Sequence, residues 1–152
     1  MKQSAQSDYI FVYGSLMATV RSRVARTFHE QAEFVGAGQI QGILYDLGQY
    51  PGLILSAEEH YVQGHVFRLL NKDTLLPFLD EYEGLIPEQP ELSEYRREIA
   101  QVKISDQPYH CWMYLYNQST NDLPLIESGN YLHYLENNPT HLTFLRSLRA
   151  NG

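Results

Sequence analysis

The chain has 152 residues, 43% of them hydrophobic, and its 18 acidic and 11 basic side chains give a formal net charge of −7. A single compact domain of this length can bury a sizeable core, so we expect one domain over residues 1–152, with residues 1–7 as a flexible tail. The acidic balance argues against a nucleic-acid binder, because such proteins gain affinity from lysine and arginine contacts to phosphates.

The sequence also carries information about compartment and metal binding. No stretch approaches the roughly 18 apolar residues of a membrane span, and we recognise no secretory signal, so we expect a cytoplasmic protein without a membrane partner. Cys111 is the only cysteine and lies in a strand-like run, which predicts a buried, inert thiol. The six histidines show no metal-ligand spacing, and we expect no metal and no cofactor.

In chain order, the first predicted element is a strand at Tyr9–Tyr13, which is apolar on both faces and should be buried on both. Gly14 and Ser15 end this strand. Glycine lets a ligand approach the main chain closely, and serine adds a short hydroxyl, so such a corner can direct several N–H groups at an anion. The alternative is an ordinary turn after a core strand, and the residues alone leave both interpretations open.

The next elements are a helix followed by strands. Thr19–Glu30 has the pattern of a short helix, with Val24 and Phe28 expected to face the core. Glu33–Leu55 consists of short apolar runs separated by glycine, which predicts two or three strands. A further strand is expected at Tyr61–Leu70. Strands therefore dominate the first half of the chain.

The clearest helix is expected at residues 72–84, with Gly84 as the stop at its C-terminus. At about 100° per residue, Glu83 falls inside the apolar stripe of this helix, whereas Glu81 falls toward the polar side. The stripe itself is formed by five residues: Leu75, Leu76, Phe78, Leu79 and Tyr82.

An inward-facing Glu83 would have unusual acid–base properties. Desolvation disfavours its charged form, and the partial negative charge of the helix C-terminus acts in the same direction. Both effects raise the pKa toward the range in which a carboxylate works as a general base near neutral pH. The alternative is that a glutamate in the last turn of a helix simply extends into water.

The second half of the chain adds two strands and further helix. Leu85–Glu94 contains two prolines and several acids, and predicts an exposed loop that is either a lid or an insertion. Strands are expected at Tyr95–Ile104 and Tyr109–Tyr116, and Tyr131–Leu148 predicts a short helix, a break at residues 137–139 and a second helix. The whole pattern indicates an α+β domain whose sheet is closed or nearly closed, with helices packed around it.

Four short motifs carry a family resemblance. They are YGSLM after the first strand, LDEYEG at the end of the clearest helix, YRREI at the start of a strand and IESGNY near the C-terminus. In this order they resemble the gamma-glutamylcyclotransferase-like family, also called AIG2-like. The resemblance implies a mixed, barrel-like β-sheet with a few short helices, whose cavity holds a gamma-glutamyl group.

The same resemblance implies roles for individual residues. Glu83 would be the acid–base residue, and Arg97 and the Ser128–Gly129 turn match family positions. Where many members continue the late turn with Asp-Trp, this chain has Asn130 and Tyr131, which affects the outer wall of the pocket and therefore the substrate. The residues implied to bind the gamma-glutamyl group are Tyr13, Gly14, Ser15, Leu16 and Tyr95.

The implied chemistry requires little from the protein. In a gamma-glutamyl amide the substrate's own α-amine can attack the γ-carbonyl and close a five-membered ring, so neither a metal nor an enzyme nucleophile is needed. We therefore expect a cyclotransferase that cleaves a small-molecule gamma-glutamyl amine or amino-acid conjugate to 5-oxoproline and a free amine, acting as a monomer or homodimer. The alternatives are a non-catalytic module that binds a gamma-glutamyl-type metabolite and an amide hydrolase.

Overall fold

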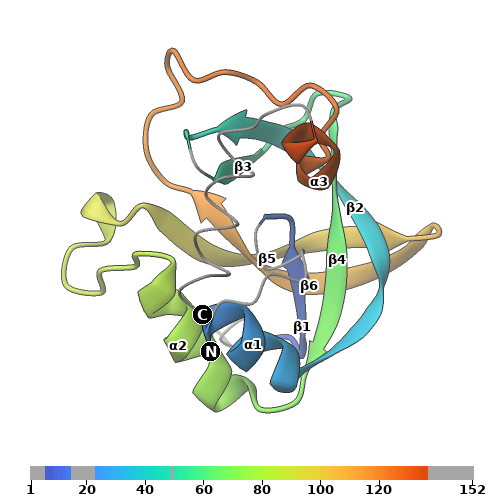
Figure 1. Cartoon of the computed structure of the whole chain (residues 1–152), viewed down its shortest axis with the longest axis vertical. Coiled ribbons are helices and arrows are strands. Elements are labelled where there is room, and N and C mark those ends of the chain that lie inside the picture. Colours follow the sequence, from blue (N-terminus) through green and yellow to red (C-terminus); the bar gives the residue numbers. More distant parts are fainter. Residues whose placement is uncertain (1–5, 15–22, 49, 137–152) are drawn as a thin grey trace, which may run out of the picture.

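A computed structural model gives the fold and describes residues 6–14, 23–48 and 50–136 (Figure 1). Within these residues, strands are the main component, and the helices are short. The elements in chain order are β1 (Tyr9–Val12), α1 (Arg23–Glu30), β2 (Ala32–Asp46), β3 (Pro51–Leu55), β4 (Tyr61–Leu69), α2 (Lys72–Tyr82), the 3-10 helix η1 (Pro90–Leu92), β5 (Tyr95–Ile104), β6 (Gln107–Tyr116) and α3 (Tyr131–Leu135).

The strands form a closed barrel. Their order is β3-β2-β4-β1-β6-β5, and β2 also pairs with β5 through Gln39 and Lys103. This pairing closes β2, β4, β1, β6 and β5 into a ring, while β3 pairs with the second half of β2. β1 runs antiparallel to β4 and parallel to β6, so the sheet is mixed. The predicted α+β fold with a barrel-like mixed sheet is confirmed.

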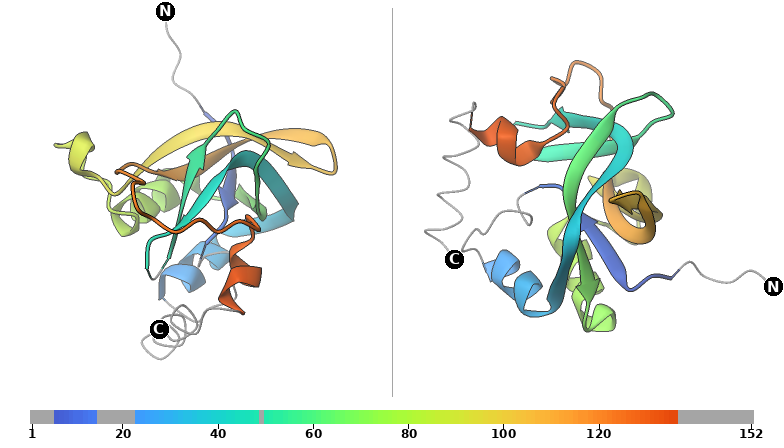
Figure 2. Two further views of the ribbon diagram at one scale, coloured as in Figure 1. Left: turned by 90° about the horizontal axis from the view of Figure 1, so that it is seen from above. Right: turned by 90° about the vertical axis from the view of Figure 1, so that its right-hand side faces the viewer.

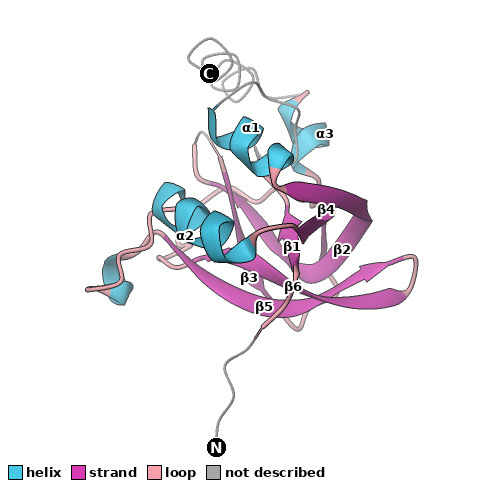
Figure 3. Cartoon of the chain, turned by 90° about the horizontal axis from the view of Figure 1, so that it is seen from below, coloured by secondary structure: helices cyan, strands magenta, loops and turns pink. Residues whose placement is uncertain are grey.

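The helices lie outside the barrel. Figure 2 shows β2 and β4 twisting together along much of the molecule, as expected for long paired strands. Seen from above and from below, α1 and α3 lie on the side opposite the β5–β6 hairpin (Figures 2 and 3). α1 also contacts α2. The helices thus cover one side of the barrel and leave the hairpin on the other.

The centre of the core is β1, as its sequence predicts. Ile10 and Phe11 are essentially inaccessible to solvent, and Val12 and Tyr13 are only 6% exposed. β1 lies between β4 and β6, so neighbouring strands cover both of its edges. Cys111, which is opposite Tyr9 in the sheet, is fully buried, and burial raises the pKa of its thiol to about 12. The prediction of a buried thiol is confirmed.

The helices follow their predicted faces with one exception. Phe28 of α1 is fully buried, and Val24 packs partly buried against the core. Tyr82, which the helical wheel places in the apolar stripe of α2, is 41% exposed, so this part of the prediction is wrong. Tyr82 is the last residue of α2, and at a helix end a tyrosine can leave its hydroxyl in water. The buried residues of α2 are Leu75, Leu76 and Leu79.

The Leu85–Glu94 segment is mostly exposed, as predicted, but hydrogen bonds fasten it to the protein. The N–H of Ile86 donates to the hydroxyl oxygen of Ser93 at 2.7 Å. The side-chain amides of Asn117 and Gln118 both donate to the carbonyl oxygen of Ser93, at 3.1 and 2.7 Å. The bond from Ile86 joins the two ends of the segment, and the bonds from Asn117 and Gln118 hold it against the residues that follow β6.

Some predictions fall outside the described residues. They concern residues 1–5 of the expected tail, Ser15 and Leu16, the first part of the expected helix at residues 19–22, and the break and second helix at residues 137–148. Among the described residues, Glu33–Leu55 contains two strands, within the predicted number, and α3 matches the first helix expected after Tyr131.

The turn before α3 depends on a glycine in the IESGNY motif. Gly129 has a φ of +66°, and a Cβ atom there would lie 2.0 Å from the carbonyl oxygen of Tyr61. The carbonyl oxygen of Gly129 in turn accepts a hydrogen bond from the N–H of Gln63 at 2.7 Å. The turn is therefore packed directly on the backbone of β4, and only glycine fits this position.

We predict that Gly129→Ala lowers the free energy of unfolding by about 3 kcal/mol or more, because both the clash and the positive φ disfavour a side chain. Gly48→Ala is the matched control: Gly48 has a φ of +111°, but a Cβ there would meet nothing within 4 Å. It should cost about 1 kcal/mol from backbone strain alone. Urea denaturation of both variants measures the difference, and equal losses would contradict this account of the turn.

Candidate functional site

Glu83 lies where α2 ends and the chain reverses. It is the C-cap residue of the helix, and its N–H donates to the carbonyl oxygen of Leu79 at 2.8 Å. Gly84 follows with a φ of +76°, and the N–H of Leu85 donates back to the carbonyl oxygen of Asp80 at 3.0 Å. This is the hydrogen-bonding pattern of a glycine-terminated helix, and it fixes the backbone from which the Glu83 side chain projects.

The environment of Glu83 favours its protonated form. Desolvation of the carboxyl group is the main cause that raises its pKa, and the negative charges of Glu94 and Asp80 add to it, giving a pKa of about 8. The residue as a whole keeps some exposed surface at the helix end. The inward direction that the helical wheel gave for Glu83 agrees with this placement.

Four tyrosines gather around Glu83 from different parts of the fold. Burial raises the pKa of each phenol well above its usual value, and the negative charge of Glu83 contributes to the shift in all four. The phenols are therefore protonated at neutral pH, and each has one O–H to donate. They are Tyr13 at the end of β1, Tyr50 before β3, Tyr95 at the start of β5 and Tyr114 in β6.

Two of these phenols donate their protons to backbone carbonyls. The hydroxyl of Tyr13 donates to the carbonyl oxygen of Tyr114 at 2.5 Å and accepts from the N–H of Leu53 at 3.3 Å. The hydroxyl of Tyr95 donates to the carbonyl oxygen of Pro51 at 2.6 Å.

The other two phenols donate to acids. Tyr114 donates to Asp80 and Tyr50 donates to Glu94, both at 2.6 Å. None of the four phenol protons is therefore directed at Glu83. This arrangement leaves the Glu83 carboxyl group able to exchange a proton with a bound molecule.

Asp80 and Arg97 form a fixed ion pair beside this cluster. Two nitrogens of the Arg97 guanidinium donate to the two carboxylate oxygens of Asp80, at 2.8 and 3.1 Å. The guanidinium carbon also lies 4.3 Å from the centre of the Trp112 ring, a cation–π distance. Arg97, which matches the family arginine, thus joins β5 to α2 and balances the charge of Asp80.

The glycine corner lies on the same side of the protein as these phenols. A Cβ atom on Gly14 would lie 3.2 Å from Cγ of Pro51, and Pro51 also accepts the hydrogen bond from Tyr95. The structure therefore brings together four of the residues singled out from the sequence: Tyr13, Gly14, Glu83 and Tyr95. The other two, Ser15 and Leu16, lie outside the described residues.

The sequence analysis missed several members of the cluster: Tyr50, Asp80, Glu94 and Tyr114. The chain has 12 tyrosines, and nothing in their spacing distinguishes those near Glu83. Glu94 belongs to a segment that we predicted to be an exposed loop. The one sequence signal that could have identified Glu94 is that it directly precedes Tyr95 in the chain.

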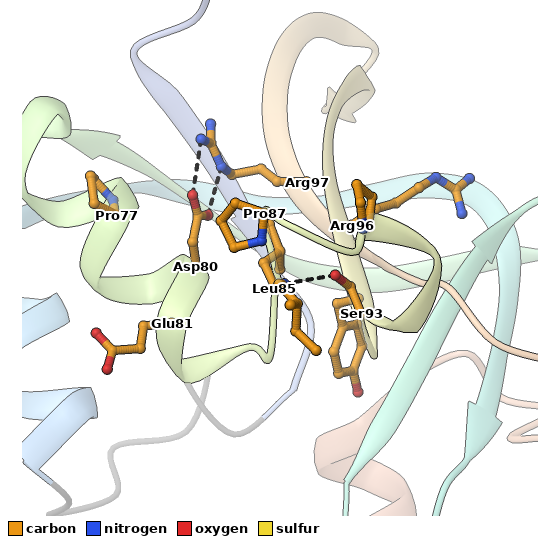
Figure 4. Close-up of a pocket in the computed structure, with 11 residues that line it drawn as sticks. Pro77, Asp80, Glu81, Leu85, Pro87, Ser93, Arg96 and Arg97 are labelled. Atoms are coloured by element: carbon orange, nitrogen blue, oxygen red, sulfur yellow. Dashed lines mark hydrogen bonds and ion pairs between the residues drawn. The ribbon is translucent and has the colours of Figure 1, made fainter.

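A pocket of about 570 Å³ lies next to this cluster, between α2 and the Leu85–Glu94 segment (Figure 4). Asp80 and Arg97 form one side, where Figure 4 shows their ion pair. Glu81 also lines the pocket, and its carboxylate extends away from this ion pair. Asp80 and Tyr95 belong both to the pocket wall and to the surroundings of Glu83. The remaining wall is largely apolar and includes Pro77, Leu85, Ile86, Pro87 and Pro90.

The chain belongs to the gamma-glutamyl cyclotransferase, AIG2-like family, whose model matches residues 10–133. The gamma-glutamylcyclotransferase family protein YtfP of Escherichia coli strain K12 is 34% identical over 125 residues, which cover 81% of this chain and 95% of that protein. A protein of Vibrio cholerae named putative gamma-glutamylcyclotransferase is 29% identical over 124 residues, covering 80% of this chain and 93% of that protein.

Solved structures agree with this assignment. The solution structure of YtfP from Escherichia coli has a TM-score of 0.58 and 30% identity, and the match covers 83% of this chain and 97% of that one. The crystal structure of YkqA from Bacillus subtilis has a TM-score of 0.66 with 17% identity, covering 88% of this chain and 42% of that one, and shows a shared fold.

Two kinds of feature are absent from the described residues, a membrane-spanning helix and a cluster of metal ligands. No helix in residues 6–14, 23–48 and 50–136 has the length and hydropathy needed to cross a membrane. Within the same ranges, no three histidine, cysteine, aspartate or glutamate residues are grouped as metal ligands would be.

The raised pKa of Glu83 predicts a pH-dependent stability. Between about pH 4.5, near the ordinary glutamate pKa, and pH 8, the folded protein keeps a proton that the unfolded chain has lost. The stabilisation is fully present below this window and is lost as the pH rises through it. Relative to Glu83→Gln, the wild-type free energy of unfolding should fall with a slope approaching about 1.4 kcal/mol per pH unit in mid-window. Urea titrations at several pH values measure it, and parallel curves for the two proteins would contradict a buried acid.

Proposed function

We propose that this protein is a gamma-glutamyl cyclotransferase that converts a gamma-glutamyl amine or amino-acid conjugate into 5-oxoproline and a free amine, with Glu83 as the acid–base residue. One observation carries the proposal: a carboxyl group with a pKa of about 8 lies among phenols whose protons are donated elsewhere. Membership of the gamma-glutamyl cyclotransferase family supports the same assignment.

The first step is removal of a proton from the substrate's α-ammonium group. A base with a pKa of about 8 is about one-tenth ionised at pH 7, and it exchanges protons readily with an amine because the two pKa values are close. An ordinary surface glutamate would be fully ionised but too weak a base for this transfer. The raised pKa of Glu83 therefore suits the reaction.

In the second step the freed α-amine attacks the γ-carbonyl carbon. A new C–N bond closes the five-membered ring, and the original amide C–N bond breaks. The α-nitrogen loses two protons overall, and both end on the departing nitrogen, which leaves as an ammonium ion. Glu83 would accept the first proton and deliver it to the departing nitrogen, a contribution of about 10²–10⁴-fold in rate.

The glycine corner and the phenols would hold the substrate. Gly14 has no side chain, so a carboxylate or a developing oxyanion can approach the main chain at the corner that it begins. The rings of Tyr13 and Tyr95 are buried and hydrogen-bonded to the backbone, which makes them rigid walls. Positioning of this kind favours ring closure, because it holds the amine close to the carbonyl.

The proposal also covers the type of substrate, the need for a metal or cofactor, and the compartment. The substrate is a small molecule that supplies its own nucleophile, so turnover proceeds without metal or cofactor in the cytoplasm. The excess of acidic side chains, which disfavours nucleic-acid partners, is consistent with this picture.

We predict that Glu83→Gln reduces kcat/KM for release of 5-oxoproline by about 10²–10⁴-fold while leaving the circular dichroism spectrum unchanged. The measurement is 5-oxoproline release from a panel of gamma-glutamyl amines, amino acids and peptides. Glu81→Gln is the matched control, because Glu81 is exposed on the same helix, and it should keep most of the activity.

Equal rates for wild type and Glu83→Gln would overturn the role of Glu83. Saturable binding of an unchanged gamma-glutamyl compound, with no product from any member of the panel, would instead identify the protein as a binding module.

A further inference from the structure

Glu94 is held against the end of α2, beside the proposed acid–base residue. Its N–H donates to the carbonyl oxygen of Gly84 at 3.3 Å, and its own carbonyl oxygen accepts from the N–H of Asn117 at 2.8 Å. One carboxylate oxygen accepts the 2.6 Å hydrogen bond from Tyr50. The other lies 3.8 Å from where a Cβ atom on Gly84 would be. The carboxylate is therefore fixed next to the residue that follows Glu83.

Among the described residues, no cation balances the negative charge of Glu94. Asp80, the other acid near Glu83, is paired with the guanidinium of Arg97. Glu94 receives a hydrogen bond from a neutral phenol, and no ion pair among the described residues includes it. Glu94 is also the charged neighbour with the largest effect on Glu83. Within the part of the chain that the structure describes, one wall of the proposed site thus presents negative charge without a paired cation.

The departing amine must lie close to this charge. Under the proposed function, Glu83 delivers a proton to the departing nitrogen, which therefore lies within hydrogen-bond reach of the Glu83 carboxyl group. A leaving group with a second nitrogen a few carbons further on can bring that nitrogen to the Glu94 carboxylate. A leaving group with a carboxylate in the same place would be repelled.

We propose that Glu94 is a specificity-determining residue that selects substrates whose departing amine carries a second, positively charged nitrogen, such as gamma-glutamyl conjugates of diamines. The proposal rests on the proposed cyclotransferase function. Tyr50 acts as the positioning residue that holds the Glu94 carboxylate in place. Substrates whose leaving group is neutral or anionic at that position react more slowly.

The expected size of the preference follows from Coulomb's law. Two unit charges about 5 Å apart, near a protein surface, interact strongly enough to change an equilibrium by tenfold or more. Glu94 is partly exposed, which weakens the interaction through solvent screening. We therefore expect kcat/KM to favour the cationic over the anionic leaving group by at least about tenfold, and the ratio to fall as salt is added.

The test uses three gamma-glutamyl amides of matched length, made from 1,4-diaminobutane, butylamine and 4-aminobutanoate. Release of 5-oxoproline gives kcat/KM for each amide with wild type, Glu94→Gln and the control Glu91→Gln, which removes an exposed acid from the same segment. Wild type and Glu91→Gln should prefer the cationic amide, and Glu94→Gln should lose most of this preference. Each ratio is taken within one variant, because Glu94→Gln also lowers the pKa of Glu83.

Two results would overturn the inference while the proposed function stands. One is equal rates for the three amides with wild type. The other is a uniform loss in Glu94→Gln with the charge preference unchanged, which would place the substrate's common α-ammonium group, and not its leaving group, at Glu94.

A separate measurement tests the role of Glu94 if the proposed cyclotransferase function is wrong. If no amide yields 5-oxoproline, calorimetric binding of the intact amides to wild type and to Glu94→Gln tests the charge preference without turnover. Tighter binding of the cationic amide to wild type, lost in Glu94→Gln, supports the selective role of Glu94. Absence of binding or of a charge preference overturns it.

Discussion

The site is organised around a carboxyl group that α2 presents, at its C-terminus, to a desolvated region. Burial disfavours the ionised form, the helix C-terminus adds partial negative charge, and Glu94 and Asp80 act in the same direction. The guanidinium of Arg97, which lies beside this region, is engaged by Asp80. No ion pair among the described residues includes Glu83, and the raised pKa accommodates its carboxyl group in the protonated form. A proton held with a pKa of about 8 can be exchanged at physiological pH, which is the property that the proposed reaction uses.

The barrel makes this arrangement rigid. Residues near Glu83 come from the end of β1, the start of β5 and the second half of β6, and each is tied to a neighbouring strand or helix. Tyr13 bonds to the backbone of β6, Tyr95 to Pro51 at the start of β3, and Tyr114 to Asp80 of α2. Closure of the barrel thus fixes the distances between these side chains. Sites supported by strands in this way are held more accurately than sites formed by loops alone.

Local patterns in the sequence identified the parts of the site but not their connections. The apolar run of β1 and the helical wheel of α2 depend only on residues that are close together in the sequence. These local patterns therefore predicted a buried strand and an inward Glu83. The helical wheel was wrong for Tyr82, because the spacing of apolar residues does not show where the end of a helix extends beyond the elements that pack against it. The pairing of Gln39 with Lys103 that closes the barrel, and the four acceptors that take the phenol protons, join segments far apart in the chain. No local pattern encodes them, and Glu94 was missed for the same reason.

The central claim is that the substrate's own amine, and not water, attacks the γ-carbonyl. Turnover of a gamma-glutamyl amide in oxygen-18 water, with mass spectrometry of the first product, tests it directly. Intramolecular attack keeps the γ-carbonyl carbon away from water, so the account predicts 5-oxoproline without the heavy isotope. A carboxyl group such as Glu83 is also able to activate water. Glutamate carrying oxygen-18, formed before any 5-oxoproline, would show hydrolysis and contradict the account.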